Sequence, residues 1–322
     1  MSDQTQPPIN KDPSRAAALQ AIQSIIQDGA NLDETLQATR SRLKDPRDRG
    51  FHHQLVMVVM RHFGEINAVL DTYLERRPKG RAAKIMGILQ MGIAQVLYLD
   101  VPDFAAVSTS VDLARQSGLT GHTKLVNAIM RRVVGGGRAL LATLDSEKLN
   151  TPTWMWDSWT ATYGEATCRA IAKAHTDGAK IDISVKTDPA SWAVKLDGEL
   201  LPTGSIRLSG GGMIESLAGY EDGQWWVQDA AAALPVKLLG DVNGKTIADL
   251  CAAPGGKTMQ LVAVGASVTA IDRSKKRLKV LHRNLYRTHL KATVLTEKAE
   301  DWKPDELLDG VLLDAPCSAT GT

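Results

Sequence analysis

The sequence predicts a chain of three parts: an all-α bundle, a small α+β domain, and an α/β domain with a parallel, doubly wound sheet. Three observations support this division. Apolar residues recur at helical spacing over about the first 135 residues. Short alternating stretches separated by Pro and Gly follow. Strands and helices then alternate to the end. We expect a frayed tail at 1–11 and domains at 12–140, 150–220 and 221–322.

Composition is that of a folded globular protein, with 43% hydrophobic and 23% charged residues among 322. No apolar run reaches the ~18 residues of a transmembrane helix, and the polar N-terminus lacks a signal core, so we expect a cytoplasmic protein. The three cysteines lie far apart and form no disulfide framework or metal signature, so no metal is expected.

The distribution of charge along the chain is more informative about possible partners than the net charge. The net charge of +2 neither demands nor forbids nucleic acid. The stretch from Arg273 to Lys291, however, holds eight Lys or Arg and no acid. Such a run is either the solvated face of a helix or a surface that faces phosphates, and both interpretations stay open.

The helical part has clear boundaries. Asp12 and Pro13 form an N-cap and first-position pair. The segment Ile85–Leu99 is apolar almost all round, which predicts a central buried helix. Pro102 follows the end of that helix, and the run Gly135–Gly137 is expected to close the domain.

The sequence from Ile181 onward predicts several strands. Ile181–Val185 alternates as a half-buried strand does. Four parallel strands with helical segments between them are expected further on, at Thr246–Leu250, Val268–Ile271, Thr293–Leu295 and Gly310–Leu313.

The strongest local signal is Asp-Leu-Cys-Ala-Ala-Pro-Gly-Gly-Lys-Thr, from Asp249 to Thr258, which follows a strand and opens a helix. Backbone N–H groups and the helix N-terminus of such a turn can meet a ligand, and Gly255 and Gly256 allow close approach. The spacing is neither a Walker loop nor GxGxxG. Asp272 ends the next strand, where a carboxylate can accept both ribose hydroxyls of a nucleoside. Helix capping is the alternative role; the glycine turn favours ribose binding.

The second signal is Asp-Ala-Pro-Cys-Ser-Ala-Thr-Gly, which starts at Asp314 directly after a strand. The first and fourth strands of a doubly wound sheet flank its switch point, so Asp314 and Cys317 should lie beside the turn Cys251–Lys257. A thiolate that attacks carbon 6 of cytosine activates carbon 5 toward a methyl group. An acid near ring nitrogen 3, the position expected for Asp314, would stabilise the adduct. A buried structural cysteine is the alternative interpretation of Cys317.

Both motifs resemble those of the RsmB / NOP2–Sun family of RNA cytosine carbon-5 methyltransferases, which use S-adenosylmethionine. Residues 12–134 are similar to NusB-like RNA-binding domains. That similarity is carried by Arg15, Asp48-Arg49 before Phe51, Val101-Pro102 and Val126-Asn127-Ala128-Ile129-Met130-Arg131. Together the resemblances imply the RsmB branch, which methylates small-subunit (16S) ribosomal RNA and has a Rossmann-like class I methyltransferase domain. They imply an RNA partner. We also expect a monomer with no membrane partner.

The resemblance also implies residue roles. Asp314 is expected to contact cofactor and base, and Cys317 to assist product release. Contacts with S-adenosylmethionine are implied for Cys251, Ala252, Ala253, Pro254, Gly255, Gly256, Lys257, Asp272 and Asp314. Contacts with RNA are implied for Arg15, Lys124, Asn127, Arg131 and Arg132. A helical domain that only supports the enzyme is the alternative.

Two departures from the family pattern stand out. Lys298 occupies the position of an adenine-contacting Asp, and Glu297, Glu300 and Asp301 all stay open as substitutes. The family's nucleophilic cysteine belongs to a Thr-Cys-Ser motif that would lie beyond Thr322. We therefore expect a C-terminally incomplete sheet with a bare fourth strand, and a chain that is inactive alone and does not trap 5-fluorocytosine RNA. The competing interpretation is a non-catalytic RNA-binding protein that works through its helical domain.

Overall fold

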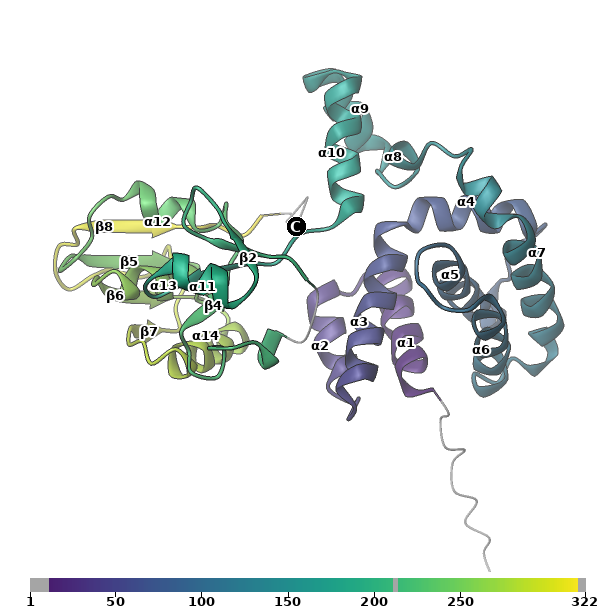
Figure 1. Cartoon of the computed structure of the whole chain (residues 1–322), viewed down its shortest axis with the longest axis horizontal. Helices are drawn as coiled ribbons and strands as arrows, with labels where there is room; N and C mark the ends of the chain where they lie inside the picture. The colour runs from purple at the N-terminus through teal and green to yellow at the C-terminus, as the bar shows by residue number, and fades with distance from the viewer. Residues whose placement is uncertain (1–11, 211–213, 318–322) are drawn as a thin grey trace, which may run out of the picture. The chain divides into compact units, whose positions relative to one another are not determined.

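A computed structural model of the chain describes residues 12–210 and 214–317. Its contacts divide the chain into two compact units, Met1–Gly178 and Ala179–Thr322, which are described separately below (Figure 1). The tail predicted at residues 1–11 lies outside the described residues. The segment expected as one domain over 150–220 is divided, because its helices Thr153–Tyr163 and Glu165–Asp177 belong to the first unit and its strands to the second.

The first unit is helical, as predicted. Its elements are α1 (Pro13–Asp28), α2 (Leu32–Arg40), α3 (Pro46–Arg61), α4 (Phe63–Tyr73), η1 (Gly80–Ala83), α5 (Lys84–Leu97), α6 (Asp103–Gln116), η2 (Thr120–His122), α7 (Thr123–Leu141), α8 (Ser146–Leu149), α9 (Thr153–Tyr163) and α10 (Glu165–Asp177). Helix α5 contacts α1, α3, α4, α6 and α7, which surround it in Figure 1. Eleven of its 14 residues are buried, so the predicted central helix is confirmed.

The start of this bundle forms as predicted, whereas its end does not. The predicted cap of α1 is confirmed, since the Asp12 carboxylate accepts a hydrogen bond from the backbone N–H of Arg15 at 3.1 Å. The prediction that Gly135–Gly137 closes the domain is wrong, because α7 continues through all three glycines. A Cβ on Gly136 would lie 2.8 Å from the Tyr73 hydroxyl oxygen, and one on Gly137 would lie 3.4 Å from Leu97. The glycines therefore let α7 pack closely on α4 and α5, and this packing overrides their low helix propensity.

The second unit begins with a small antiparallel sheet of β1 (Asp182–Val185), β2 (Gly198–Leu200), β3 (Ile206–Leu208) and β4 (Trp225–Val227), in the order β2-β3-β1-β4. Helix α11 (Pro189–Lys195) packs on it, and η3 (Ile214–Ser216) follows β3. Ile183, Ile206 and Trp225 form its core, each fully buried. Because β4 pairs with β1, this sheet extends past the boundary expected at residue 220.

The parallel sheet follows, with β5 (Thr246–Leu250), β6 (Ser267–Ile271), β7 (Thr293–Leu295) and β8 (Gly310–Leu313) in the order β7-β6-β5-β8. The order confirms the prediction that the first and fourth strands are neighbours. Helices α12 (Leu234–Leu238), α13 (Gly256–Ala263) and α14 (Lys275–Arg287) accompany the sheet. Among the described strands β8 pairs with β5 alone, and Val311 and Leu313 are 52% and 59% exposed, as expected for a bare edge.

One predicted helix does not form. Helical segments were expected between all four strands, but residues 296–309 connect β7 to β8 through turns. Pro304 lies inside this segment. It removes a backbone donor and disfavours helical geometry at the residue before it, which explains the difference.

Candidate active site

The turn from Asp249 to Thr258 joins the end of β5 to the start of α13. Its backbone turns sharply at Cys251, which has a positive φ of 62°, and at Gly255, with a φ of 105°. Ala252 N–H still donates to the Ile271 carbonyl oxygen at 3.0 Å, so the turn is bonded to the neighbouring strand. A φ of 105° is strained for any residue with a Cβ. This geometry explains why glycine stands at the N-cap of α13.

Helix α13 is held in place by a buried chain of amides. The Trp226 indole N–H donates to the Gln228 side-chain oxygen at 2.9 Å, and the Gln228 amide donates to Gln260 at 3.0 Å. Gln260 in turn donates to the Ala233 carbonyl oxygen at 2.9 Å. Satisfied polar networks of this kind fix one geometry, because breaking any link would leave a buried group unpaired. The N-terminus of α13 is therefore fixed relative to the end of β5.

Asp249 is a functional candidate that the sequence reasoning did not single out. Its side chain is 1% exposed. One carboxyl oxygen accepts a hydrogen bond from the Thr258 hydroxyl at 2.5 Å, and the other is buried with no protein partner among the described residues. Burial raises the pKa of Asp249 to about 6, assisted by the charges of Asp314 and Asp272 and opposed by Thr258 and Lys257. Its position at a strand end, just before the glycine turn, was the available signal.

Asp272 directly follows β6 and lies against the same turn. One oxygen accepts from the Ser274 N–H at 2.8 Å, and the other from the Ala253 N–H at 3.2 Å. Arg277 also pairs with it at 3.2 Å. The N-cap of α14 is Ser274, so the capping alternative for Asp272 is wrong. With 3% of its surface exposed, Asp272 is a buried carboxylate that ties β6 to the turn.

Asp314 lies across the switch point from α13, as predicted. The Lys257 ammonium, in the first turn of α13, contacts the Asp314 carboxylate at 2.6 Å. Lys257 is 13% exposed at its side chain, whereas Asp314 is 59% exposed. This ion pair joins the two sequence motifs in space.

The two cysteines of the motifs have different surroundings. Cys317 is exposed, so the alternative of a buried structural cysteine is wrong; residues 318–322 of its motif lie outside the described part. Cys251 is half-buried. Desolvation and Asp272 raise the pKa of the Cys251 thiol, with a smaller contribution from Glu300. Glu300 is one of the three acids left open as adenine contacts, and its charge acts on this turn. Asp301, another of the three, pairs with Lys298 at 3.9 Å.

The residues predicted to contact RNA lie on two helices of the first unit. Arg15 in α1 donates to Asp12 and to Gln95 and lies 4.6 Å above the Phe51 ring, so its guanidinium is largely committed to packing. The other four are on α7. Lys124 and Arg131 are exposed, Asn127 is half-buried, and Arg132 donates to the Tyr73 carbonyl oxygen at 3.2 Å.

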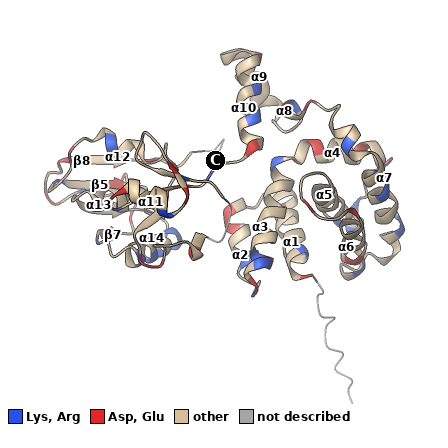
Figure 2. Ribbon diagram, viewed as in Figure 1, with Lys and Arg blue, Asp and Glu red and all other residues tan. Residues whose placement is uncertain are grey.

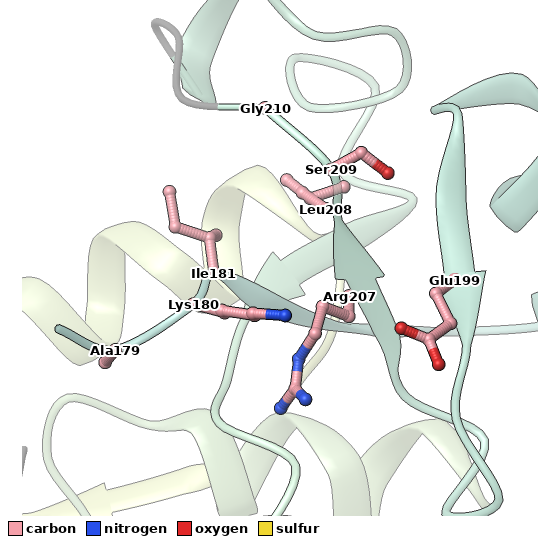
Figure 3. Close-up of a pocket in the computed structure, with 8 residues that line it drawn as sticks. All are labelled: Ala179, Lys180, Ile181, Glu199, Arg207, Leu208, Ser209 and Gly210. Atoms are coloured by element: carbon pink, nitrogen blue, oxygen red, sulfur yellow. The ribbon is translucent and has the colours of Figure 1, made fainter. Parts of the chain in front are cut away.

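A surface pocket of about 490 Å³ lies in the small antiparallel sheet (Figure 3). Its charged lining residues are Lys180, Glu199 and Arg207. The Arg207 guanidinium is already paired with buried Asp182 at 2.8 Å. None of the lining residues belongs to the two motifs, so we do not assign the pocket to the candidate active site.

The described residues, 12–210 and 214–317, lack two further features. They contain no group of three or more His, Cys, Asp or Glu able to hold a metal ion. No helix among them has both the length and the apolar character needed to cross a membrane.

Comparison with known proteins covers nearly the whole chain. Residues 12–135 match the NusB family, and residues 236–322 match the family 16S rRNA methyltransferase RsmB/F. Ribosomal RNA small subunit methyltransferase B of Shigella sonnei is 30% identical over 95% of this chain and 75% of its own length. The Escherichia coli O139:H28 protein of that name is 29% identical over the same shares.

A solved structure has the same fold. The crystal structure of PH0851 superposes with a TM-score of 0.70 over 97% of this chain and 76% of its own, at 18% identity.

Proposed function

The chain belongs to the RsmB/F family of 16S rRNA methyltransferases, and on that premise we propose that its reaction is the transfer of a methyl group from S-adenosylmethionine to carbon 5 of a cytosine in small-subunit ribosomal RNA. Neither Cys251 nor Cys317 is proposed as the thiolate that attacks carbon 6, so the 322 residues alone are still expected to be inactive. The family implies a methyl donor. The identity of that donor, the carbon-5 position and the roles of single residues are our proposals. The joining of the two motifs at one switch point is the observation that carries them.

The residues around the turn fit S-adenosylmethionine. The buried, unpartnered oxygen of Asp249 is an acceptor suited to the ammonium of an amino acid. We assign the ribose hydroxyls of the cofactor to the Asp272 carboxylate. We assign its amino-acid part to the backbone of Cys251–Lys257. Gly255 is the N-cap of α13, whose N-terminus adds positive potential beside the carboxylate of such a ligand. When bound, the cofactor supplies an electrophilic methyl group.

Asp314 and Cys317 are proposed to act on the base. Asp314 is exposed enough to meet a cytosine, while Lys257 holds one of its oxygens. An acid at ring nitrogen 3 stabilises the negative charge that develops after attack on carbon 6. Cys317 lies exposed beyond the end of β8, and we propose that it assists release of the methylated base. Lys257 thus works as a positioning residue for Asp314.

The helical unit is proposed to hold the ribosomal RNA. Its match to the NusB family supports this role. Lys124 and Arg131 are exposed seven residues apart on α7, so they project from one side of that helix and suit phosphate contacts. Arg15 and Arg132 are bonded to neighbouring protein groups, so their contribution is to shape this surface as well as to carry charge.

Binding of the methyl donor tests the proposal at the step that these residues carry. Isothermal titration calorimetry of the 322-residue chain with S-adenosylmethionine should show one site. Asp272→Ala removes a charged acceptor of ribose hydroxyls, which contributes about 1.5–3 kcal/mol per hydrogen bond, so Kd should rise at least about tenfold.

Two further variants separate a lost contact from a lost fold. Asp272→Asn keeps the size of the side chain and an acceptor for the Ser274 N–H but loses the ion pair with Arg277, so it should bind more weakly than wild type and still unfold in one cooperative transition followed by circular dichroism. Asp222→Ala, an exposed acid of the same unit, should bind as wild type does. Wild-type affinity in Asp272→Ala would contradict the assigned cofactor position.

A further inference from the structure

The outer face of α14 is a second candidate for RNA contact, in the catalytic unit. We propose that Lys275, Lys279, Arg283 and Tyr286 form a surface that binds a single-stranded segment of the ribosomal RNA substrate, with the three cations on phosphates and Tyr286 stacked on a base. The inference rests on the proposed function, since it assumes an RNA substrate, and it adds where on the catalytic unit that RNA lies.

The helix is strongly two-sided. Leu278, Leu281 and Leu285 are buried against the sheet. Lys275, Lys279 and Arg283 recur every fourth residue and are all exposed. At 3.6 residues per turn they share one side of the helix, and Tyr286 falls among them. The basic residues along α14 are marked in Figure 2.

Five of the six Lys and Arg residues of α14 fall into two groups with different tasks. Arg277 pairs with Asp272 and donates to the Ala253 carbonyl oxygen, and Arg287 donates to the Tyr220 and Trp225 carbonyl oxygens. These two arginines hold the helix in place. Lys275, Lys279 and Arg283, in contrast, form no ion pair with any residue in 12–210 or 214–317. Their charge is therefore left for an external anion.

Tyr286 distinguishes nucleic acid from other polyanions. It is 85% exposed, although a tyrosine gains most by burying its ring. An exposed aromatic ring amid cations is the arrangement by which proteins bind single strands, because the ring stacks on an unpaired base while the cations track the backbone. An acidic protein surface would use the cations but would have no specific need of the ring.

The location connects this surface to the active site. Asn284 in α14 donates to the Pro254 carbonyl oxygen at 2.9 Å, and Arg277 donates to that of Ala253. Gly255 is packed so closely against α14 that a Cβ there would lie 3.0 Å from Leu281. One side of α14 thus supports the proposed cofactor turn, and another side presents the cations. An RNA bound to these cations would lie next to the proposed cofactor pocket.

The test measures RNA affinity by fluorescence anisotropy, with the 322-residue chain and a fluorescein-labelled single-stranded RNA of about 20 nucleotides. The variant Lys275→Ala/Lys279→Ala/Arg283→Ala should raise Kd at least about tenfold at 0.1 M salt. The slope of log K against log salt should shrink by about 2, at ~0.7 per lost phosphate contact. The matched control, Lys195→Ala/Lys237→Ala/Lys303→Ala, removes three exposed cations of the same unit and should change Kd little.

Tyrosine 286 is tested separately from charge. Tyr286→Ala should weaken single-strand binding about tenfold with an unchanged salt slope, and Tyr286→Phe should restore it, since phenylalanine also stacks. A fully duplex RNA of the same length should show no dependence on this position.

Calorimetric titration with S-adenosylmethionine on the same variants keeps the two proposals distinct. Weakened RNA binding with unchanged cofactor binding supports the surface. RNA affinity of the α14 triple variant equal to that of its control would overturn it, and would leave the face to an acidic protein. Failure of the wild type to bind the cofactor would overturn the proposed function and leave the comparison of RNA affinities valid.

Discussion

Asp249 shows how one residue can be costly for folding and useful for binding. Its carboxyl group is buried with one oxygen unpaired, and burial without a partner destabilises the charged form. Strain or desolvation of this kind is common at functional sites, where a ligand later completes the interactions. We interpret the unpaired oxygen as part of the proposed cofactor pocket.

The first prediction concerns the pH dependence that Asp249 creates. Its pKa rises from an ordinary 3.8 to about 6 in the folded chain, so the folded state binds its proton more tightly than the unfolded state does. This contribution to stability is complete below pH 3.8 and is lost as pH rises through 6, a change of about 3 kcal/mol. Relative to Asp249→Asn, the wild type should lose about 2.5 kcal/mol of that amount between pH 4 and pH 7.

Urea unfolding monitored by circular dichroism at several pH values measures this difference. Asp222→Asn, at an exposed position of the same unit, should run parallel to wild type over the whole range. Parallel curves for Asp249→Asn and wild type would show that the carboxyl group titrates normally in the folded chain.

At the scale of elements, the short helix α8 depends on a buried cluster around Glu65. Glu65, in α4, is 4% exposed and accepts hydrogen bonds from His62 at 2.9 Å, from Asn150 at 2.6 Å and from Ser146. The Asn150 side-chain oxygen in turn accepts a hydrogen bond from the Glu65 N–H at 3.1 Å. These contacts join α8 and the residue after it to the bundle. Helix α8 depends on them because a helix of four residues is not stable alone.

The second prediction follows from that cluster. Desolvation favours the neutral acid, but the hydrogen bonds of His62, Ser146 and Asn150 outweigh it and hold the pKa of Glu65 at about 2. The stabilisation is therefore present above the ordinary value of 4.5 and is lost as pH falls from 4.5 toward 2. Glu65→Gln should destabilise the first unit by about 1–3 kcal/mol at pH 7, and by less at pH 3.

Guanidinium unfolding of the two proteins at both pH values gives this comparison. Glu75→Gln, an exposed acid soon after α4, serves as the control and should have no measurable effect. If Glu65→Gln matched that control at pH 7, α8 would have to be held by packing alone.

At the scale of the molecule, each unit has its own hydrophobic core. The large core of the helical unit is built from residues of α1–α7 and their connections, from Ala18 to Val133. The second unit has separate clusters, among them one around Ile183 and Trp225 and one between α14 and the parallel sheet. Units that bury their own apolar surface can fold by themselves.

The third prediction is that residues 12–178, produced alone, form a folded helical protein. Its thermal unfolding at 222 nm should be a single cooperative transition, because none of its core residues comes from beyond residue 178. A gradual, non-cooperative loss of signal would mean that the second unit is needed to complete the fold of the first.

The sequence by itself determined the helical character of the first unit, the four parallel strands and the two motifs that identify the family. These features depend on local patterns, namely apolar periodicity, capping pairs and strand-end turns, which neighbouring residues fix between them. The switch-point rule also placed Asp314 beside the turn of Cys251–Lys257, and its contact with Lys257 confirms that placement.

Only the tertiary structure decided features that depend on distant neighbours. Gly135–Gly137 signals a break locally, yet α7 continues because Tyr73 and Leu97 pack against it. Strand β4, Trp225–Val227, pairs with β1, and no local sequence pattern indicated this pairing. Whether a polar group finds a partner is likewise set by groups far along the chain. For that reason two features became visible only in three dimensions: the Asp249 oxygen that has no partner within 12–210 and 214–317, and the lack of ion pairs to the same residues at Lys275, Lys279 and Arg283.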